Sequence, residues 1–257
     1  MDQRQLIELL RDVRAGTVTP DAAAQRIGDL PFAEVVHAVG ATLIDHHREL
    51  RTGVPEIVYG ASKTAEQIAA ALGEIAKRDG ALATRVDAAK AARVAELAPG
   101  VRYHELARVM TLGTPAARPA CAPIAIVCAG TSDLAVAEEA ALVAEYLGAP
   151  VVRISDVGVA GLHRLLARLP DIKRAEVVVA VAGMEAALPP VLGGLVDRPL
   201  IAVPTSVGYG VSVDGLVALG ALLAGCAPGI SVVNIDNGVG AAVAAVRIAR
   251  LAVRGAQ

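Results

Sequence analysis

Residues 124–133 read Ile-Ala-Ile-Val-Cys-Ala-Gly-Thr-Ser-Asp. The first part, Ile124–Cys128, is continuously apolar, as a strand buried on both faces of a sheet must be. A glycine turn follows, and Ser, Thr and Asp are common caps for a helix, which the next residues predict at about 133–147. A buried strand, a glycine turn and a helix in direct succession form the unit from which parallel α/β sheets are built.

The same unit recurs to the end of the chain. Further strands are predicted at Val151–Ser155, Glu176–Ala182, Leu200–Pro204 and Ser231–Ile235. Further helices are predicted at about 160–168, 185–195, 214–224 and 239–252. This alternation predicts right-handed crossovers and a parallel sheet with helices on both faces, which is a three-layer α/β/α domain.

The N-terminal part predicts a smaller α+β domain. Helical spacing appears in residues 6–13, 20–27, 64–78 and 87–97, and strands are expected at Thr42–Ile44, Glu56–Gly60, Leu82–Val86 and within Tyr103–Leu112. The segment Gly113–Pro119 contains two prolines and shows neither the helical nor the strand periodicity of apolar residues. We therefore place a domain boundary there, which gives domains 1–118 and 119–257.

Composition excludes several classes of protein. The 257 residues carry a net charge of −2 and include one Phe, four Tyr and no Trp. A polybasic surface for nucleic acid or anionic lipid is therefore not expected, nor is an aromatic platform for stacking bases. Three unevenly spaced cysteines do not form a disulfide framework or a metal-ligand pattern, which favours a cytoplasmic protein.

One apolar stretch resembles a membrane span. Residues 215–235 contain no charge, but three glycines and Pro228 interrupt them, and the apolar pattern changes at Pro228. A buried helix followed by a buried strand explains this pattern better than a transmembrane helix.

The turns after the predicted strands share a chemical character. Ligands of an open parallel sheet bind outside the carboxyl ends of its strands, and glycines, hydroxyls and carboxylates gather there. The candidate residues are Thr131, Ser132, Asp133, Asp156, Gly183, Met184, Glu185, Thr205, Ser206, Gly208, Tyr209, Asn234, Asp236 and Asn237. No GxGxxG turn follows the first strand, so an ordinary dinucleotide-binding fold is disfavoured. The GxSxG and HExxH motifs are also absent from the sequence.

Basic side chains supply further candidates for binding anions. His163 and Arg164 fall in the first turn of the helix after the second strand, where a histidine can also be a packed or capping residue. Arg48, Arg51 and Lys63 lie near glycines in the N-terminal domain. A solvated, charged connection is the alternative interpretation of all three.

A thiol between two glycines is the remaining unusual feature. Cys226 lies in Gly225-Cys226-Ala227-Pro228-Gly229, whereas Cys121 and Cys128 are interpreted as structural. Cys226 is expected at the C-terminal end of a helix. This end of a helix raises the pKa of a thiol, which argues against reactivity of Cys226. Because Cys226 follows a helix and precedes a strand, it is expected at the edge opposite the turns. Either its loop folds over the sheet or a second subunit brings it to the site.

Several motifs together resemble the LarB family of carboxylase/hydrolases, which act in nickel-pincer nucleotide cofactor biosynthesis. They are Asp45–Arg48, Tyr59–Gly60, Lys63–Thr64, Gly130–Asp133, Gly158–Leu166, Ala182–Pro189, Pro204–Gly210 and Cys226–Gly240. The C-terminal half also resembles the PurE class, which moves a carboxyl group on aminoimidazole ribonucleotide. That class has a catalytic histidine where this chain has Ala187.

The resemblance implies a PurE-like fold and a specific reaction. Nicotinic acid adenine dinucleotide would be carboxylated at C5 of its pyridinium ring with CO₂ or bicarbonate, and its phosphoanhydride would be hydrolysed. Cys226 would form a transient adduct with the ring, with Glu185, Asp133 and Asp236 as further catalytic candidates. Mg²⁺ held by Glu185 or Asp236 is expected, without an organic cofactor, in a homo-octamer.

Two alternatives remain open at this point. One is a purine-type carboxylase or mutase acting on aminoimidazole ribonucleotide, against which Ala187 argues. The other is a nucleotide-binding protein without catalysis, for which blocking Cys226 would have no effect.

Overall fold

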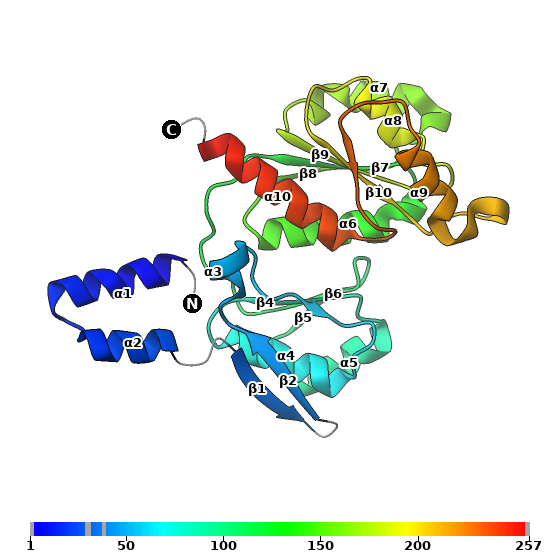
Figure 1. Cartoon of the computed structure of the whole chain (residues 1–257). Coiled ribbons are helices and arrows are strands. Elements are labelled where there is room, and N and C mark those ends of the chain that lie inside the picture. The colour runs from blue at the N-terminus through cyan, green and yellow to red at the C-terminus, as the bar shows by residue number, and fades with distance from the viewer. Residues whose placement is uncertain (1–2, 29–31, 38–39, 255–257) are drawn as a thin grey trace. The chain divides into compact units, whose positions relative to one another are not determined.

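The computed structural model describes residues 3–28, 32–37 and 40–254 (Figure 1). The chain divides into two compact units. The first comprises Met1–Tyr103 and Met110–Ala116, and the second comprises His104–Val109 and Ala117–Gln257. The division after Ala116 falls inside the Gly113–Pro119 segment, in which the sequence loses its periodicity.

The first unit combines helices with two small sheets. Helices α1 (Gln3–Ala15) and α2 (Pro20–Gly28) are followed by an antiparallel pair of strands, β1 (Phe32–His37) and β2 (Gly40–Asp45), and by the short helix α3 (Arg48–Thr52). The second sheet has the order β3-β4-β6-β5. Its strands are β3 (Val58–Tyr59), β4 (Ala81–Thr84), β5 (Arg102–His104) and β6 (Val109–Leu112).

Helices α4 (Ala65–Ala76) and α5 (Ala88–Leu97) complete this unit. Thr64 and Gln67 form a capping box at the start of α4, which satisfies free amide groups of its first turn. Ile68, Leu72 and Ile75 lie on one face of α4 and pack into the core of this unit. The structure thus confirms a small α+β unit before the parallel sheet.

The second unit contains the predicted parallel sheet. Its strands are β7 (Ile124–Cys128), β8 (Val151–Ile154), β9 (Val177–Ala182), β10 (Leu200–Pro204) and β11 (Ile230–Val232). They lie in the order β11-β10-β9-β7-β8, and every neighbouring pair is parallel. β7, β9 and β10 are buried along their whole length, which explains their continuous apolar runs.

Helices cover both faces of this sheet. They are α6 (Leu134–Tyr146), α7 (Leu162–Ile172), α8 (Leu188–Gly193), α9 (Leu216–Leu223) and α10 (Gly238–Arg254). In Figure 1, α6 and α10 lie on one side of the sheet and α7 and α8 on the other. Side chains of α7, α8 and α9 share one buried cluster with β7, β9 and β10. The predicted three-layer α/β/α architecture is therefore confirmed.

The helix predicted at about 160–168 extends to Ile172, and two other predicted elements of this unit have wrong limits for local reasons. The strand predicted at Ser231–Ile235 ends at Val232, because the Asn234 side chain accepts a hydrogen bond from the Ile235 backbone at 2.9 Å and turns the chain. The helix predicted at 185–195 begins only at Leu188, because Ala186 has a φ of 50°, which a right-handed helix does not allow.

The first unit differs from its prediction at three places. The strand expected at Glu56–Gly60 is only Val58–Tyr59, and Tyr103–Leu112 splits into β5 and β6 around Arg108, whose φ is 52°. β1 and α3 were not predicted. No helix within the described ranges is both long and apolar enough to cross a membrane, and residues 215–235 form α9 and β11.

Candidate active site

All strands of the second unit end at one edge, and the turns after them form the candidate site. After β7 the chain builds β8 on one side, and then returns to build β9, β10 and β11 on the other. The strand order therefore reverses between β7 and β9. Open α/β sheets bind their ligands at such a reversal, outside the carboxyl ends of the strands.

Asp133 lies at the centre of a hydrogen-bond network beneath this edge. The residue is 4% exposed, and its carboxylate accepts hydrogen bonds from Thr205 Oγ1 at 2.6 Å and from the Gly130 backbone at 3.0 Å. The Gly183 backbone amide also donates to it. Burial raises the pKa of Asp133, whereas these hydrogen bonds lower it. Asp133 thus joins the turns after β7, β9 and β10, and its catalytic role stays a prediction.

The backbone of this edge is unusual at four residues close to the ends of the strands. Asp156, Met184, Ala186 and Asp236 have φ values of 58°, 54°, 50° and 55°. These values are uncommon for residues other than glycine, because Cβ crowds the neighbouring carbonyl oxygen. They follow strands β8, β9 and β11. Backbone strain of this kind clusters at functional sites, so its position favours this edge as the site.

Polar groups above the Asp133 network are accessible to a ligand. Exposed residues among the candidates are Thr131, Ser132, Asp156, Met184, Glu185, Ser206, Gly208, Tyr209 and Asn234. Asp236 accepts a hydrogen bond from the Ser206 backbone at 2.8 Å, which joins the last two turns. The Asn237 side chain accepts one from the Gly240 backbone at 2.8 Å at the start of α10.

His163 and Arg164 lie in the first turn of helix α7, near the turn after β8. The Arg164 guanidinium forms an ion pair with Asp156 at 2.5 Å, and His163 is exposed. An anion at this point must therefore compete with Asp156 for Arg164. Thr131–Asp133 and Val159–Gly161, which precede α6 and α7, are short 3-10 turns.

The three cysteines lie in different environments. Cys128 is buried and donates from Sγ to the Gly130 carbonyl at 3.0 Å, and burial raises its pKa to about 12. Burial also raises the pKa of the half-buried Cys121. Cys226 is exposed. Since reactive thiols are accessible and structural thiols are buried, Cys226 is the candidate nucleophile.

Cys226 lies at the far edge of its own sheet. It belongs to the connection from α9 to β11, and its neighbour Ala227 packs near Gly193, the last residue of α8. That is the edge where strands begin, as the order of the elements predicts. Within one chain, therefore, the structure does not bring Cys226 together with the carboxyl-edge turns.

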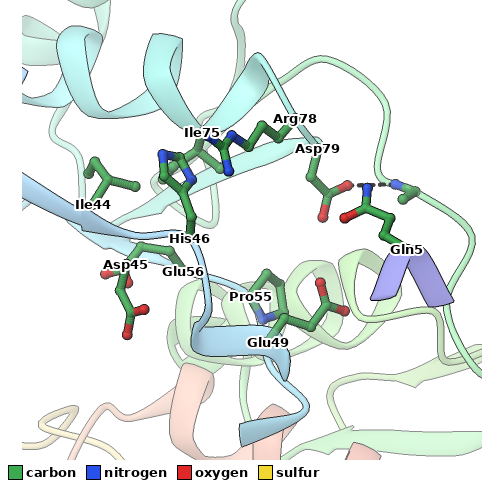
Figure 2. A pocket seen from close by; sticks show the side chains of 11 residues that line it. Gln5, Ile44, Asp45, His46, Glu49, Pro55, Glu56, Ile75, Arg78 and Asp79 are labelled. Carbon is green, nitrogen blue, oxygen red and sulfur yellow. Dashed lines mark hydrogen bonds between the residues drawn. The ribbon is translucent and has the colours of Figure 1, made fainter. Parts of the chain in front are cut away.

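The basic candidates of the first unit are engaged with carboxylates. Arg51 pairs with Asp45 at 2.6 Å and Arg48 with Glu56 at 3.3 Å. Both carboxylates line a small cavity of about 50 Å³ within this unit, which Figure 2 shows. The cavity is lined by Gln5, Ile44, Asp45, His46, Glu49, Pro55, Glu56, Ile75, Arg78, Asp79 and Ala116. Its many carboxylates make it unsuited to a phosphate group. Lys63 lies elsewhere in the unit, after β3.

Comparison with protein families identifies the second unit. A model of the AIR carboxylase family matches residues 123–256, which include the whole parallel sheet and its helices. The chain belongs to the AIR carboxylase family. A model of the LarB/PurE-like N-terminal domain matches residues 36–114 of the first unit. This member of the AIR carboxylase family thus has the two-domain architecture of LarB.

Two curated relatives extend this result. An uncharacterized protein of Methanocaldococcus jannaschii is 35% identical over 262 residues, which cover 96% of this chain and 98% of that protein. N5-carboxyaminoimidazole ribonucleotide mutase of the same organism is 36% identical over 133 residues, which cover 50% of this chain and 79% of the mutase. The AIR carboxylase domain gives this chain a PurE-like, carboxylase-family function.

Thr205→Val is expected to lower the free energy of unfolding by about 1–3 kcal/mol. Thr205 is fully buried, and valine keeps its shape but cannot donate to Asp133. Urea unfolding measures the change. The control is Thr131→Val, which alters an exposed hydroxyl at the same edge and should stay within about 0.5 kcal/mol. Equal unfolding midpoints for wild type and Thr205→Val would contradict the role of the Thr205–Asp133 bond.

Proposed function

We propose that this chain carboxylates nicotinic acid adenine dinucleotide at C5 of the pyridinium ring and hydrolyses its phosphoanhydride. The products are pyridinium-3,5-biscarboxylic acid mononucleotide and AMP. The observation that carries the proposal is an exposed thiol, Cys226, in a chain whose Ala187 replaces the histidine of the PurE class. The missing histidine argues against the chemistry of the PurE class, whereas the exposed thiol can act as a covalent nucleophile once it is ionised.

The ring needs a nucleophile before it can react with CO₂. A pyridinium is electron-poor, so its carbons do not attack another electrophile. Addition of the Cys226 thiolate to a neighbouring ring carbon removes the positive charge and makes C5 part of an enamine, which attacks CO₂. Loss of the C5 proton and departure of the thiolate restore the aromatic ring. The positive ring also stabilises a nearby thiolate.

The carboxyl-edge turns suit the phosphates of this substrate. Thr131 and Ser132 are exposed hydroxyl residues of the 3-10 turn that precedes α6, and Ser206 is an exposed hydroxyl residue two positions after β10. Their hydrogen bonds would hold the two phosphates, while a water molecule attacks one phosphorus and AMP leaves. Exposed Tyr209, Met184 and Asn234 are the neighbouring candidates for contacts to the sugar and rings.

Mg²⁺ is proposed as the metal that neutralises the phosphates. The described part of the chain holds no group of three or more His, Cys, Asp or Glu side chains placed to bind a metal ion. Mg²⁺ in nucleotide enzymes is commonly held by one or two carboxylates together with substrate phosphates. The exposed Glu185 and the half-buried Asp236 are the carboxylates that could serve as these one or two ligands.

The proposal requires a neighbouring copy of the chain. Cys226 lies opposite the carboxyl-edge turns in one chain, so a second subunit must supply the thiol to the site. Large apolar residues near the turns support self-association, since Tyr209, Val211 and Val213 are 80%, 83% and 56% exposed. A homo-octamer of the PurE type is the proposed assembly.

Incubation with nicotinic acid adenine dinucleotide, bicarbonate and Mg²⁺ tests the function directly. Mass analysis should show a mononucleotide that has gained one carboxyl group, together with AMP. Carboxyl transfer on aminoimidazole ribonucleotide in a parallel reaction would instead favour the purine-type activity. Binding of the dinucleotide without either product would indicate a nucleotide-binding protein and contradict the proposal.

Glu185→Gln is expected to raise the Mg²⁺ concentration that gives half-maximal AMP release by about tenfold, because an amide is a weaker Mg²⁺ ligand than a carboxylate. The measurement is a Mg²⁺ titration of AMP release. Glu176→Gln is the matched control, since Glu176 precedes β9 at the opposite edge and pairs with Arg198. An unchanged Mg²⁺ requirement in Glu185→Gln would exclude Glu185 as a ligand.

A further inference from the structure

The first unit has a second edge at which two parallel strands end. β3 and β4 are parallel, with Tyr59 opposite Thr84. The Gly60 backbone donates a hydrogen bond to the Thr84 carbonyl at 2.8 Å, so the turns that follow these strands start side by side. The residues after them, Gly60–Lys63 and Arg85–Val86, lead into α4 and α5.

The turn after β3 is held rigidly. Lys90 Nζ donates to the carbonyls of Gly60 at 3.3 Å and Ala61 at 2.6 Å. A side chain at Gly60 would come within 2.7 Å of Val86 Cγ2, so the turn tolerates only glycine without rearrangement. The starts of α4 and α5 are already capped by Thr64 and Asp87, so side chains rather than free helix amides are the donors available at this edge.

Two cations gather on this rigid frame. Arg85 has a φ of 56°, and its guanidinium carbon lies 5.8 Å from the centre of the Tyr59 ring. Lys63 Nζ makes no hydrogen bond or ion pair with any residue in the ranges that the structure describes. Two carboxylates lie at the starts of α4 and α5: Glu66 is 3.4 Å from Arg93 Nε, and Asp87 is 3.5 Å from Lys90 Nζ.

These features suit a doubly charged anion. Stacking on the half-exposed Tyr59 orients the guanidinium, whose planar shape matches the paired oxygens of a phosphate. Lys63 adds a point charge from the neighbouring turn. Arg85 is half-buried, and its φ of 56° is uncommon for residues other than glycine and is of the kind that clusters at functional sites.

We propose that the edge formed by Tyr59, Lys63 and Arg85 binds the phosphate of a nucleotide-like ligand. Lys63 and Arg85 contact the phosphate, and Tyr59 positions Arg85. The proposed site does not depend on the carboxylation chemistry. It gives the LarB/PurE-like N-terminal domain a binding function of its own.

The test uses the full chain and the variant Arg85→Gly. Calorimetry with AMP, inorganic phosphate and adenosine should show binding of the first two and none of adenosine at this edge. Arg85→Gly should weaken phosphate binding at least about tenfold, which is the usual loss for one charge-assisted hydrogen-bonded contact. Its melting temperature should not fall, because glycine adopts a φ of 56° without strain. If Arg85 has only a structural role, Arg85→Gly should bind phosphate as tightly as wild type.

The matched control is Lys77→Met. Lys77 follows the last residue of α4, at the opposite end of that helix from Lys63, and it pairs with Glu74. This variant also removes one positive charge and should bind phosphate like wild type. Lys63→Met provides a second variant with the same expected loss as Arg85→Gly. Equal binding by wild type, Arg85→Gly and Lys63→Met would overturn the proposal.

Hydrogen exchange locates the site independently of affinity. AMP should slow exchange in residues 60–64 and 85–87, and Arg85→Gly should remove that protection. Protection confined to residues 129–133 and 205–210 would overturn the proposal, because it would place AMP only at the candidate active site. The outcome is independent of turnover, which Cys226→Ser tests separately.

Discussion

Cys226→Ser is expected to abolish formation of the carboxylated mononucleotide, with a loss of at least about 10³-fold, as for other removed nucleophiles. A serine hydroxyl is hardly ionised near neutral pH and leaves a ring carbon poorly, so neither formation nor breakdown of the adduct would proceed. The measurement is mass-spectrometric detection of the carboxylated product under initial-rate conditions.

The structure makes this variant easy to interpret. Cys226 is exposed, so its replacement removes no core contact and the protein should unfold at the wild-type midpoint. Cys121→Ser is the matched control, because it removes a thiol from a half-buried position outside the candidate site and should keep full activity. Carboxylation at an undiminished rate by Cys226→Ser would rule out the covalent route and return attention to non-covalent chemistry of the PurE class.

The sequence predicts the sheet of the second unit well because burial itself leaves a pattern. β7, β9 and β10 are apolar at every position, so their limits follow from composition almost to the residue. The limits of α8 and β11 depend instead on a positive φ at Ala186 and a side-chain hydrogen bond of Asn234, which hydrophobic periodicity does not encode. β1 and α3 are short and half-exposed, so their apolar period is too weak to detect.

The candidate site is predicted less completely than the fold. That polar turns meet at one edge follows from parallel strands, and the exposed hydroxyls are found there. The link between Asp133 and Thr205 could not be predicted, because these residues are 72 positions apart and meet only through the strand order β10-β9-β7. A threonine directly after a fully apolar strand was the available signal, since a buried hydroxyl there needs a partner.

Gly183→Ala is expected to have the largest effect on stability at this edge, a loss of about 3 kcal/mol, which is at the upper end for overpacking. A methyl group at Gly183 would overlap the Val207 carbonyl oxygen and lie 2.6 Å from Thr205 Oγ1. The first is a backbone atom and the second belongs to the buried Asp133 network, so neither can move away without a large cost in free energy. The turns after β9 and β10 must separate, which breaks the Met184–Val207 backbone hydrogen bond of 2.9 Å.

Chemical denaturation measures this loss, and Gly220→Ala in α9 is its control. A methyl group at Gly220 meets nothing within 4 Å, and alanine favours a helix by up to about 1 kcal/mol over glycine, so this variant should be neutral or more stable. Gly183→Ala should also lose binding of the dinucleotide, because the exposed Met184, Glu185 and Ser206 are held by the same turns. If Gly183→Ala unfolds like wild type, the turns after β9 and β10 can separate without cost, and the Asp133 network does not fix the geometry of the site.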